Sequence, residues 1–383
     1  MLKWFAIVLM PTVAMAEVDQ GPANADFTPA FAQQTRAPAL PDTSVSVEVF
    51  ATGLEHPWGI APLEGDRWLV TERLGRLRVL FADGSLSAPV EGVPEVAAVR
   101  QGGLLDVSVA DGVVFLTYAK AVDGGYATAA ALAVLVEQDG QFSLTDVRDI
   151  FIQEPPSDFP MHYGSRVVPD GDVVWITTGE HSDRSERERA QDVTTTYGVV
   201  VRVDAEGVPP ADNPFVGADG IDTIWSYGHR NVQGAVVGPD GALWTIEHGP
   251  RGGDELNRPE PGLNYGWPVI SYGVNYNGSD VGIGLAVLDG MEQPIYYWDP
   301  VIAPGGMAFY EGDLFDWQGD LLIGSLNPGA LVRLRMQDGL VVGEERLFSG
   351  EGRIRDVEIT PDGAVLLLVD SADGTVLRIT PEG

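Results

Sequence analysis

The chain has 383 residues, of which 44% are hydrophobic, 47 are Gly, 27 are Pro and none is Cys. The absence of cysteine excludes disulfides, thiolate metal sites and cysteine nucleophiles, and the many Gly and Pro residues favour short strands and turns over long helices. A formal net charge of -33 repels phosphate backbones and anionic lipids, so nucleic acid and membrane partners are not expected, and most carboxylates are assigned to a solvated acidic surface.

The N-terminus has the pattern of an export signal. Residues 1–16 combine Lys3, an apolar run over residues 4–13, and the small residues Ala14 and Ala16. This pattern predicts a signal peptide cleaved after Ala16 and therefore a periplasmic or secreted protein. The apolar run is too short to span a bilayer, so no membrane insertion is expected.

Residues 17–43 are rich in Ala, Pro, Gln and Asp without periodicity, which predicts a flexible leader. From residue 44 to residue 383 one unit recurs, consisting of an apolar strand, a tight turn containing Gly, and a second strand with a bulky residue soon after the Gly. The six bulky residues are Trp68, Phe115, Trp175, Trp244, Leu322 and Leu366.

Further Asp-Gly and Glu-Gly turns follow several of these hairpins, so each unit is predicted to form a four-stranded antiparallel sheet. Six sheets that cannot bury their faces alone predict an all-β, six-bladed β-propeller over residues 44–383. The strand at residues 44–50 is expected to complete the last blade and close the ring. A pair of β-sandwiches is the structural alternative.

If the first strand of each unit is innermost, the residues that enter it and those that leave the second strand share one mouth of the channel. Most of the histidines and the isolated arginines occur at these positions, directly before the first strand or directly after the second strand of a unit. The set comprises His56, Arg73, Gln101, Lys120, His162, Glu180, Arg230, Asn231, His248, Asn327, Arg353, Arg355 and Asp370.

His162 is followed by Gly164, which lets the backbone approach a ligand closely. A neutral imidazole at this position can act as a general base, and Glu180, 18 residues later, is placed to orient it. The competing interpretation is a hydrogen-bonded structural histidine. His181 and the charged run at residues 182–189 are predicted to form a solvated loop.

Arg353 and Arg355 alternate around Ile354, so both side chains are expected on one side of a strand. Adjacent guanidinium groups predict a bound carboxylate or phosphate, unless they form salt bridges with blade carboxylates. The stretch at residues 249–255 combines irregular backbone with two acids, and such oxygen ligands suit Ca²⁺ better than Zn²⁺.

Ordered motifs run through nearly the whole chain after residue 45: GLEHPWGIA, QGGLLDV, HYGSR, IWSYGHRNVQG, EHGPRGGDELN, NYGWP, YYWDPVIAP and GRIRDV. With these motifs the chain resembles the soluble pyrroloquinoline quinone (PQQ)-dependent aldose sugar dehydrogenases of the glucose/sorbosone dehydrogenase family. The resemblance implies a six-bladed propeller, PQQ held over the channel mouth with a Ca²⁺ ion, and oxidation of sugars at the anomeric carbon to lactones.

The resemblance also implies roles for individual residues. His162 matches the catalytic base, Glu180 its acidic support, and Arg230 with Asn231 the pair at the quinone carbonyls and the ion. Gln101, Arg353 and Arg355 match residues that contact the cofactor, and Asn327 occupies the cofactor-side position of a Lys in glucose-specialised members. Gly249 and Pro250 match the backbone carbonyl ligands of the quinone's Ca²⁺, and Glu255 and Tyr265 match positions of a second, structural Ca²⁺.

Asp299 stands where the glucose-specialised relatives have an aromatic residue. Asp299 and Asn327 are both expected to overlook the ligand, so the resemblance predicts oxidation of several aldoses with weak discrimination and an unidentified electron acceptor. Two alternatives remain from other functional classes: a Ca²⁺-dependent propeller that hydrolyses lactones, and a sugar-binding propeller without turnover.

Overall fold

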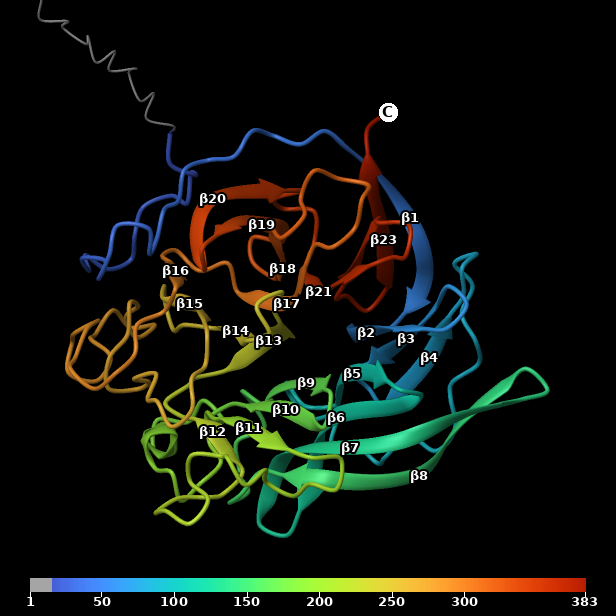
Figure 1. Cartoon of the computed structure of the whole chain (residues 1–383), viewed down its shortest axis with the longest axis horizontal. Coiled ribbons are helices and arrows are strands. Elements are labelled where there is room, and N and C mark those ends of the chain that lie inside the picture. Colours follow the sequence, from blue (N-terminus) through green and yellow to red (C-terminus); the bar gives the residue numbers. More distant parts are fainter. Residues whose placement is uncertain (1–15) are drawn as a thin grey trace, which may run out of the picture.

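The computed structural model describes residues 16–383, so the predicted signal peptide, except for its last residue, falls outside the described residues. Six antiparallel sheets are arranged radially around one axis (Figure 1). The innermost strands of successive blades contact one another in a closed circle. The predicted six-bladed β-propeller is therefore confirmed.

The strands are given blade by blade, from the axis outward. Blade 1 contains β2 (Pro57–Leu63), β3 (Arg67–Glu72) and β4 (Arg76–Leu80); blade 2 contains β5 (Leu104–Ala110), β6 (Val113–Val122), β7 (Gly125–Gln138) and β8 (Gln141–Ile152); blade 3 contains β9 (Gly164–Asp170), β10 (Val173–Thr178), β11 (Val200–Val203) and β12 (Ile224–Ser226). Blade 4 contains β13 (Val232–Val237), β14 (Leu243–Glu247), β15 (Asp254–Asn257) and β16 (Tyr296–Trp298); blade 5 contains β17 (Pro304–Phe309), β18 (Leu321–Ser325), β19 (Ala330–Gln337) and β20 (Leu340–Leu347); blade 6 contains β21 (Ile354–Ile359), β22 (Val365–Val369), β23 (Gly374–Pro381) and β1 (Val45–Leu54).

The ring closes as expected, because β1 pairs antiparallel with β23 and supplies the outermost strand of blade 6. Blade 1 differs from the prediction, since its sheet has three strands rather than four. A single bridge between Leu80 and Leu86 stands where a fourth strand would lie. The structure also contains a short 3-10 helix, η1 (Arg187–Gln191).

Hydrophobic side chains fill the spaces between neighbouring blades rather than one central core. The six predicted bulky residues all lie on the second strand of their blades and are buried. Trp244, for example, packs with Phe309 of the next blade, and Trp175 packs with Leu243. This packing between blades fixes the position of each inner hairpin. Polar side chains are therefore found along the central axis, where residues 16–383 form no apolar core.

At one end of the axis, the inner hairpin of each blade has a shift in register. Such bulges re-aim side chains at the edge of a sheet. Three buried threonines brace them, because each hydroxyl accepts a main-chain N–H within its own blade and donates to a carbonyl of the next: Thr71, Thr117 and Thr177. Hydrogen bonds from these threonines therefore fix the main chain at this end of the channel.

Residues 17–43, predicted to be a flexible leader, instead pack along the outside of blades 4 and 5 (Figure 1). Asn24 donates through Nδ2 to Asp299 Oδ1 at 2.6 Å, and the main-chain N–H of Asn24 donates to Asp299 Oδ2 at 2.8 Å. Gln34 is fully buried and donates to the carbonyl of Pro294. Side-chain to backbone bonds, which composition does not reveal, hold this segment.

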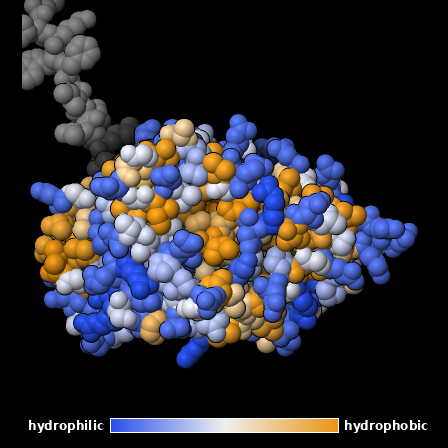
Figure 2. Space-filling model, turned by 90° about the horizontal axis from the view of Figure 1, so that it is seen from below, coloured by the Kyte–Doolittle hydropathy of each residue, from blue (hydrophilic) through white to orange (hydrophobic). Residues whose placement is uncertain are grey.

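Seen edge-on, the visible part of the disc has hydrophilic residues interspersed with hydrophobic ones, without a continuous apolar band (Figure 2). Over residues 16–383, no helix has the length and apolar character needed to cross a bilayer.

Candidate functional site

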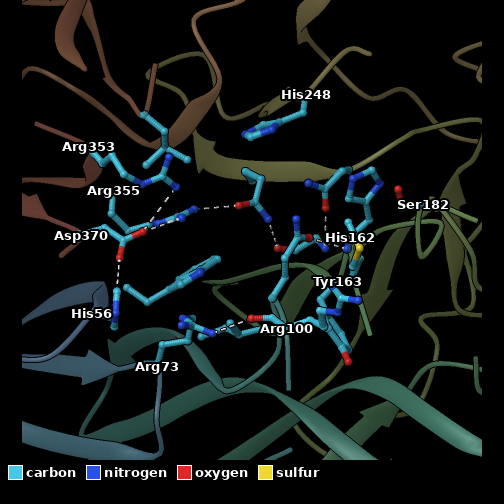
Figure 3. Close-up of a pocket in the computed structure, with 18 of the residues that line it drawn as sticks. His56, Arg73, Arg100, His162, Tyr163, Ser182, His248, Arg353, Arg355 and Asp370 are labelled. Atoms are coloured by element: carbon cyan, nitrogen blue, oxygen red, sulfur yellow. Dashed lines mark hydrogen bonds and ion pairs between the residues drawn. The ribbon is translucent and has the colours of Figure 1, made fainter. Parts of the chain in front are cut away.

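A cavity of about 460 Å³ opens at the mouth where the bulges lie. Residues from all six blades line it, and Figure 3 shows their side chains converging on one space. Five arginines contribute to the lining, whereas Asp370 is the one carboxylate among the lining residues: Arg73, Arg100, Arg230, Arg353 and Arg355. In a chain of net charge -33, this concentration of cations indicates a site for an anionic ligand.

His162 and Glu180 form the most buried polar pair of the cavity wall. His162 Nδ1 lies 2.7 Å from Glu180 Oε2, and both side chains are almost completely buried. Burial lowers the pKa of His162, and the nearby Arg230 lowers it further against the opposing effect of Glu180. The imidazole is therefore neutral at pH 7, with the proton on Nδ1 facing the carboxylate and the lone pair of Nε2 free to accept a proton.

The carboxylate behind His162 is ionised. Burial alone would raise the pKa of Glu180, but His162, Arg230 and the N–H of Ser182 outweigh that effect and lower it. A charged acceptor that is held in this way keeps the imidazole in one tautomer and one orientation.

The backbone around His162 requires glycine at two positions. Gly164 has a φ of +65°, and a Cβ there would lie 2.4 Å from the carbonyl carbon of Thr178. A Cβ on Gly179 would lie 2.0 Å from the carbonyl oxygen of His162. His162 itself has a φ of 45°, a left-handed conformation that is uncommon outside glycine and concentrates at functional sites.

Arg230 connects the His162 pair to the opposite wall. Its Nη1 donates to the carbonyl of His248 at 3.0 Å, its Nε lies 4.0 Å from Glu180 Oε1, and its guanidinium stacks over Trp267. The buried Nε has no hydrogen-bond partner in the described part of the chain. Arg230 therefore retains donor capacity for an oxygen-bearing ligand.

Asn231 and Gln101 are anchored through their side-chain oxygens. Asn231 Oδ1 accepts the N–H of Gly164 at 3.0 Å, and Gln101 Oε1 accepts the N–H of His162 at 2.8 Å. Since both residues line the cavity, their amide NH₂ groups remain as donors toward a ligand.

Arg355 and Arg353 stand on the blade 6 side of the cavity (Figure 3). Arg355 is buried and donates to Asp370 Oδ2 at 2.9 Å and to Gln233 Oε1 at 3.0 Å. Arg353 is half exposed and lies 3.6 Å from the same carboxylate. One carboxylate for two guanidinium groups leaves a net positive charge, so the salt-bridge interpretation accounts for only part of this pair.

Gly249 and Pro250 follow directly after His248, which lines the cavity, but neither residue is itself part of the lining. The N–H of Gly249 donates to Asp254 Oδ1 at 2.7 Å, and Asp254 Oδ2 accepts the N–H groups of Ile302 and Ala303. This carboxylate therefore fixes the loop by its N–H groups, which fits the use of main-chain carbonyls as hard ligands for Ca²⁺.

Glu255 and Tyr265 lie beneath the cavity, beside a small void next to Glu247. Burial raises the pKa of Glu255 well above its usual value, and the charge of Glu247 raises it further. Asn257 Nδ2 donates to both carboxylates. Two buried acids at such proximity fit a divalent cation. The Tyr265 hydroxyl donates to the carbonyl of Arg258 and accepts the main-chain N–H of Glu260. The main-chain carbonyl of Tyr265 is therefore its group that remains for a cation.

Two residues that were expected to overlook the ligand do not line the cavity. Asn327 is exposed beyond the end of β18, and its neighbour Leu326 takes the place in the wall. Asp299 is buried under the leader, where Asn24 and Ala25 donate to it. The leader covers Asp299, and Leu326 rather than Asn327 lines the cavity after β18, so a role of either residue at the substrate stays a prediction.

Several lining residues carried weaker sequence signals. Arg100 adjoins the predicted mouth position Gln101, and Tyr276 comes from a long Gly-rich loop, whereas Trp58 lies at a predicted mouth position itself. His181, predicted in a solvated loop, is fully buried between the carbonyl of Phe159 and Gln153. Burial lowers the pKa of His181 to about 4, so it packs behind the catalytic candidates as a neutral group.

Comparison with known proteins agrees with this architecture. Residues 54–378 match the family model described as Glucose / Sorbosone dehydrogenase. The "Aldose sugar dehydrogenase YliI" of Escherichia coli (strain K12) is 41% identical over 356 residues, which cover 90% of this chain and 94% of that protein.

Solved structures give the same result. The soluble aldose sugar dehydrogenase from Escherichia coli in the apo-form superposes with a TM-score of 0.84 at 39% identity, covering 88% of this chain and 100% of that one. The PQQ-bound aldose sugar dehydrogenase from Streptomyces coelicolor superposes with a TM-score of 0.70 at 27% identity, covering 89% and 100%. The chain belongs to the glucose/sorbosone dehydrogenase family.

Proposed function

We propose that this protein is a PQQ- and Ca²⁺-dependent dehydrogenase that oxidises aldose sugars at the anomeric carbon to lactones. The observation that carries the proposal is the neutral, carboxylate-supported His162 in a cavity whose other charged groups are nearly all arginines. A base beside a cationic pocket suits proton removal from a sugar hydroxyl next to an anionic redox cofactor.

The cavity offers groups that fit PQQ, which carries carboxylates and quinone carbonyls. Arg353 and Arg355 would hold the carboxylates, since they share a single acidic partner. Arg230, Asn231 and Gln101 would donate to the carbonyl side. When bound, PQQ supplies the two-electron acceptor for the C1 hydrogen of the sugar.

The protein's own contribution is a positioned base and a fixed field. His162 Nε2 accepts the proton of the anomeric hydroxyl, and Glu180 stabilises the resulting imidazolium through Nδ1. Arg230 lies beside Glu180 and next to the loop at residues 248–250. Its positive charge would stabilise negative charge that develops on the bound cofactor. Gly249 and Pro250 would hold Ca²⁺ by their carbonyls, and Glu255 with the main chain of Tyr265 would hold a second ion.

The side chains around the propeller axis fit the two alternative functions, a lactone hydrolase and a sugar-binding protein, less well. A metal-dependent lactonase would need several carboxylate or amide ligands there, and no cluster of three or more His, Asp or Glu side chains suited to a metal occurs within residues 16–383. The axis instead holds Arg166 in ion pairs with Asp106 and Asp356. A binding protein without turnover would leave the buried pair of His162 and Glu180 without a role.

Reconstitution tests the proposal. The purified protein, freed of metal and cofactor, is assayed with D-glucose and D-xylose and an artificial electron acceptor, with PQQ and Ca²⁺ added singly and together. Turnover that requires both supports a dehydrogenase; lactone hydrolysis with Ca²⁺ alone supports the hydrolase; sugar binding without turnover supports the binding protein. Export with cleavage after Ala16 stays a separate prediction, tested by sequencing the N-terminus of the mature protein.

A further inference from the structure

We propose that Arg73 and Arg100 recognise anionic aldoses, meaning sugars that carry a carboxylate or a phosphate away from the anomeric carbon. This inference rests on the proposed function and names a substrate class for the same site. It concerns recognition only and adds no chemical step.

The five arginines of the cavity differ in their acidic partners. Arg353 and Arg355 share Asp370, and Arg230 lies 4.0 Å from Glu180. Arg73 and Arg100 have no carboxylate within ion-pair distance in the described part of the chain. They are therefore the two cavity arginines that have no acidic partner of their own.

The guanidinium of Arg73 lies against the main chain of Arg100. Arg73 Nη1 donates to the carbonyl of Arg100 at 2.7 Å, which leaves its other guanidinium nitrogens available. Arg100 is exposed, makes no side-chain hydrogen bond among residues 16–383, and has a φ of 56°. Two guanidinium groups that line one cavity without an acidic partner favour a carboxylate or phosphate, which accepts their hydrogen bonds and neutralises their charge.

Their position is on the side of the cavity where the reacting sugar must lie. Arg100 directly precedes Gln101, whose Oε1 accepts the main-chain N–H of His162. Figure 3 shows Arg73 between His56 and Arg100, and Arg100 between Arg73 and Tyr163, with Arg353 across the cavity from them. A sugar that gives its anomeric proton to His162 therefore has its remaining carbons within reach of this wall, while the blade 6 arginines serve the cofactor.

The overall charge of -33 does not cancel this recognition. At physiological ionic strength the screening length is about 8 Å, so a ligand inside the cavity senses the arginines beside it more strongly than the distant acidic surface. Because the anomeric hydroxyl must be free to react, the negative charge has to sit elsewhere on the sugar, as in a uronate or a hexose 6-phosphate.

The test compares D-glucuronate and D-glucose 6-phosphate with D-glucose on the PQQ- and Ca²⁺-loaded protein at fixed physiological ionic strength. An uncharged quinone serves as electron acceptor, so that acceptor charge does not enter. We expect at least one anionic sugar to exceed D-glucose in kcat/KM by roughly three- to tenfold, the gain expected for one or two partly exposed ion pairs. The two anionic sugars distinguish a carboxylate from a phosphate ligand.

Arg100→Gln should reduce the ratio of anionic to neutral kcat/KM by roughly three- to tenfold. The matched control is Arg148→Gln, which removes an equal charge from an exposed arginine of β8 that pairs with Glu206 and should leave the ratio unchanged. A titration of D-glucuronate into the PQQ-free protein, followed by NMR, gives a second readout that does not depend on turnover; Arg100→Gln should weaken this binding.

A ratio at or below one for both anionic sugars would overturn the inference, as would a ratio that Arg100→Gln leaves unchanged. A fall in PQQ affinity without a change in the ratio would reassign Arg100 to the cofactor and also overturn it. Absence of turnover with every sugar, neutral or anionic, would instead contradict the proposed function, so the two failures are distinguishable.

Discussion

His162 Nδ1 lies 2.7 Å from Glu180 Oε2, and the two side chains share a nearly solvent-free position under the cavity. The residues are 18 positions apart, on either side of the β9–β10 hairpin, so the fold of blade 3 alone brings them together. The imidazole is thereby fixed in the tautomer that leaves Nε2 as a base.

His162→Ala should lower kcat by roughly 10²- to 10⁴-fold, the usual loss for a general base. PQQ binding and the unfolding midpoint should change little in comparison, because the residue lies at the cavity wall and not between blades. Steady-state kinetics on the reconstituted variant, with a PQQ titration by fluorescence as control, check this. A variant with near wild-type turnover would remove His162 from the mechanism.

The pH profile follows from the lowered pKa of His162. The base is active when neutral, so kcat/KM should stay level as the pH falls toward 6.5 and decline only below that value. Glu180→Gln removes the carboxylate that favours the imidazolium, so the acid limb should move to still lower pH while kcat falls. An acid limb above pH 6.5, or one that Glu180→Gln does not move, would contradict the assigned pair.

Arg355→Ala should weaken PQQ binding more than Arg353→Ala. Arg355 is buried and held by Asp370 and Gln233, whereas Arg353 is half exposed, and charge-assisted hydrogen bonds gain strength with burial. Titration of PQQ into each apo variant measures the difference. Equal affinities for both variants and the wild type would return the two arginines to a purely structural role.

Asn24→Ala should lower the free energy of unfolding by about 1 to 3 kcal/mol, because it removes a hydrogen bond to the buried carboxylate of Asp299. The matched control is Asp26→Ala, an exposed leader residue, which should change stability by less than about 0.5 kcal/mol. Urea unfolding of the wild type, Asn24→Ala and Asp26→Ala measures the three free energies of unfolding. Equal stability for all three would mean that the leader contributes nothing to the folded state.

Ca²⁺ should raise the unfolding midpoint of the metal-free protein, because a divalent cation neutralises the buried acids Glu247 and Glu255. Glu255→Gln should raise the midpoint without Ca²⁺ and reduce the further gain on adding it, since one of the two repelling charges is gone. Thermal scans with Ca²⁺ or a chelator test both expectations. A Ca²⁺ response of full size in Glu255→Gln would place the ion elsewhere.

The repeated hairpin and the phase of its polar residues were enough to predict the propeller and to bring Gln101, His162, Arg230, Asn231, Arg353 and Arg355 to one cavity. Asp299 lies away from the cavity because its hydrogen-bond partners belong to the leader, whose main-chain N–H groups donate to its carboxylate, and composition does not reveal such contacts. Arg100 was missed because a left-handed backbone turn, not strand periodicity, directs it into the wall. Hydrophobic periodicity thus predicts the strands. It does not predict side-chain positions that depend on turn conformation or on polar contacts between distant parts of the chain.

Reconstitution of the wild-type protein beside His162→Ala is the decisive measurement of whether His162 is the base of a PQQ- and Ca²⁺-dependent dehydrogenase. Both proteins are freed of metal and cofactor, then supplied with PQQ and Ca²⁺ singly and together, and acceptor reduction is followed with D-glucose and D-glucuronate. We expect turnover only with both additions, with lactone as the product, and a kcat roughly 10²- to 10⁴-fold lower in His162→Ala than in the wild type. Turnover without PQQ, or equal turnover in His162→Ala that binds PQQ normally, would contradict it.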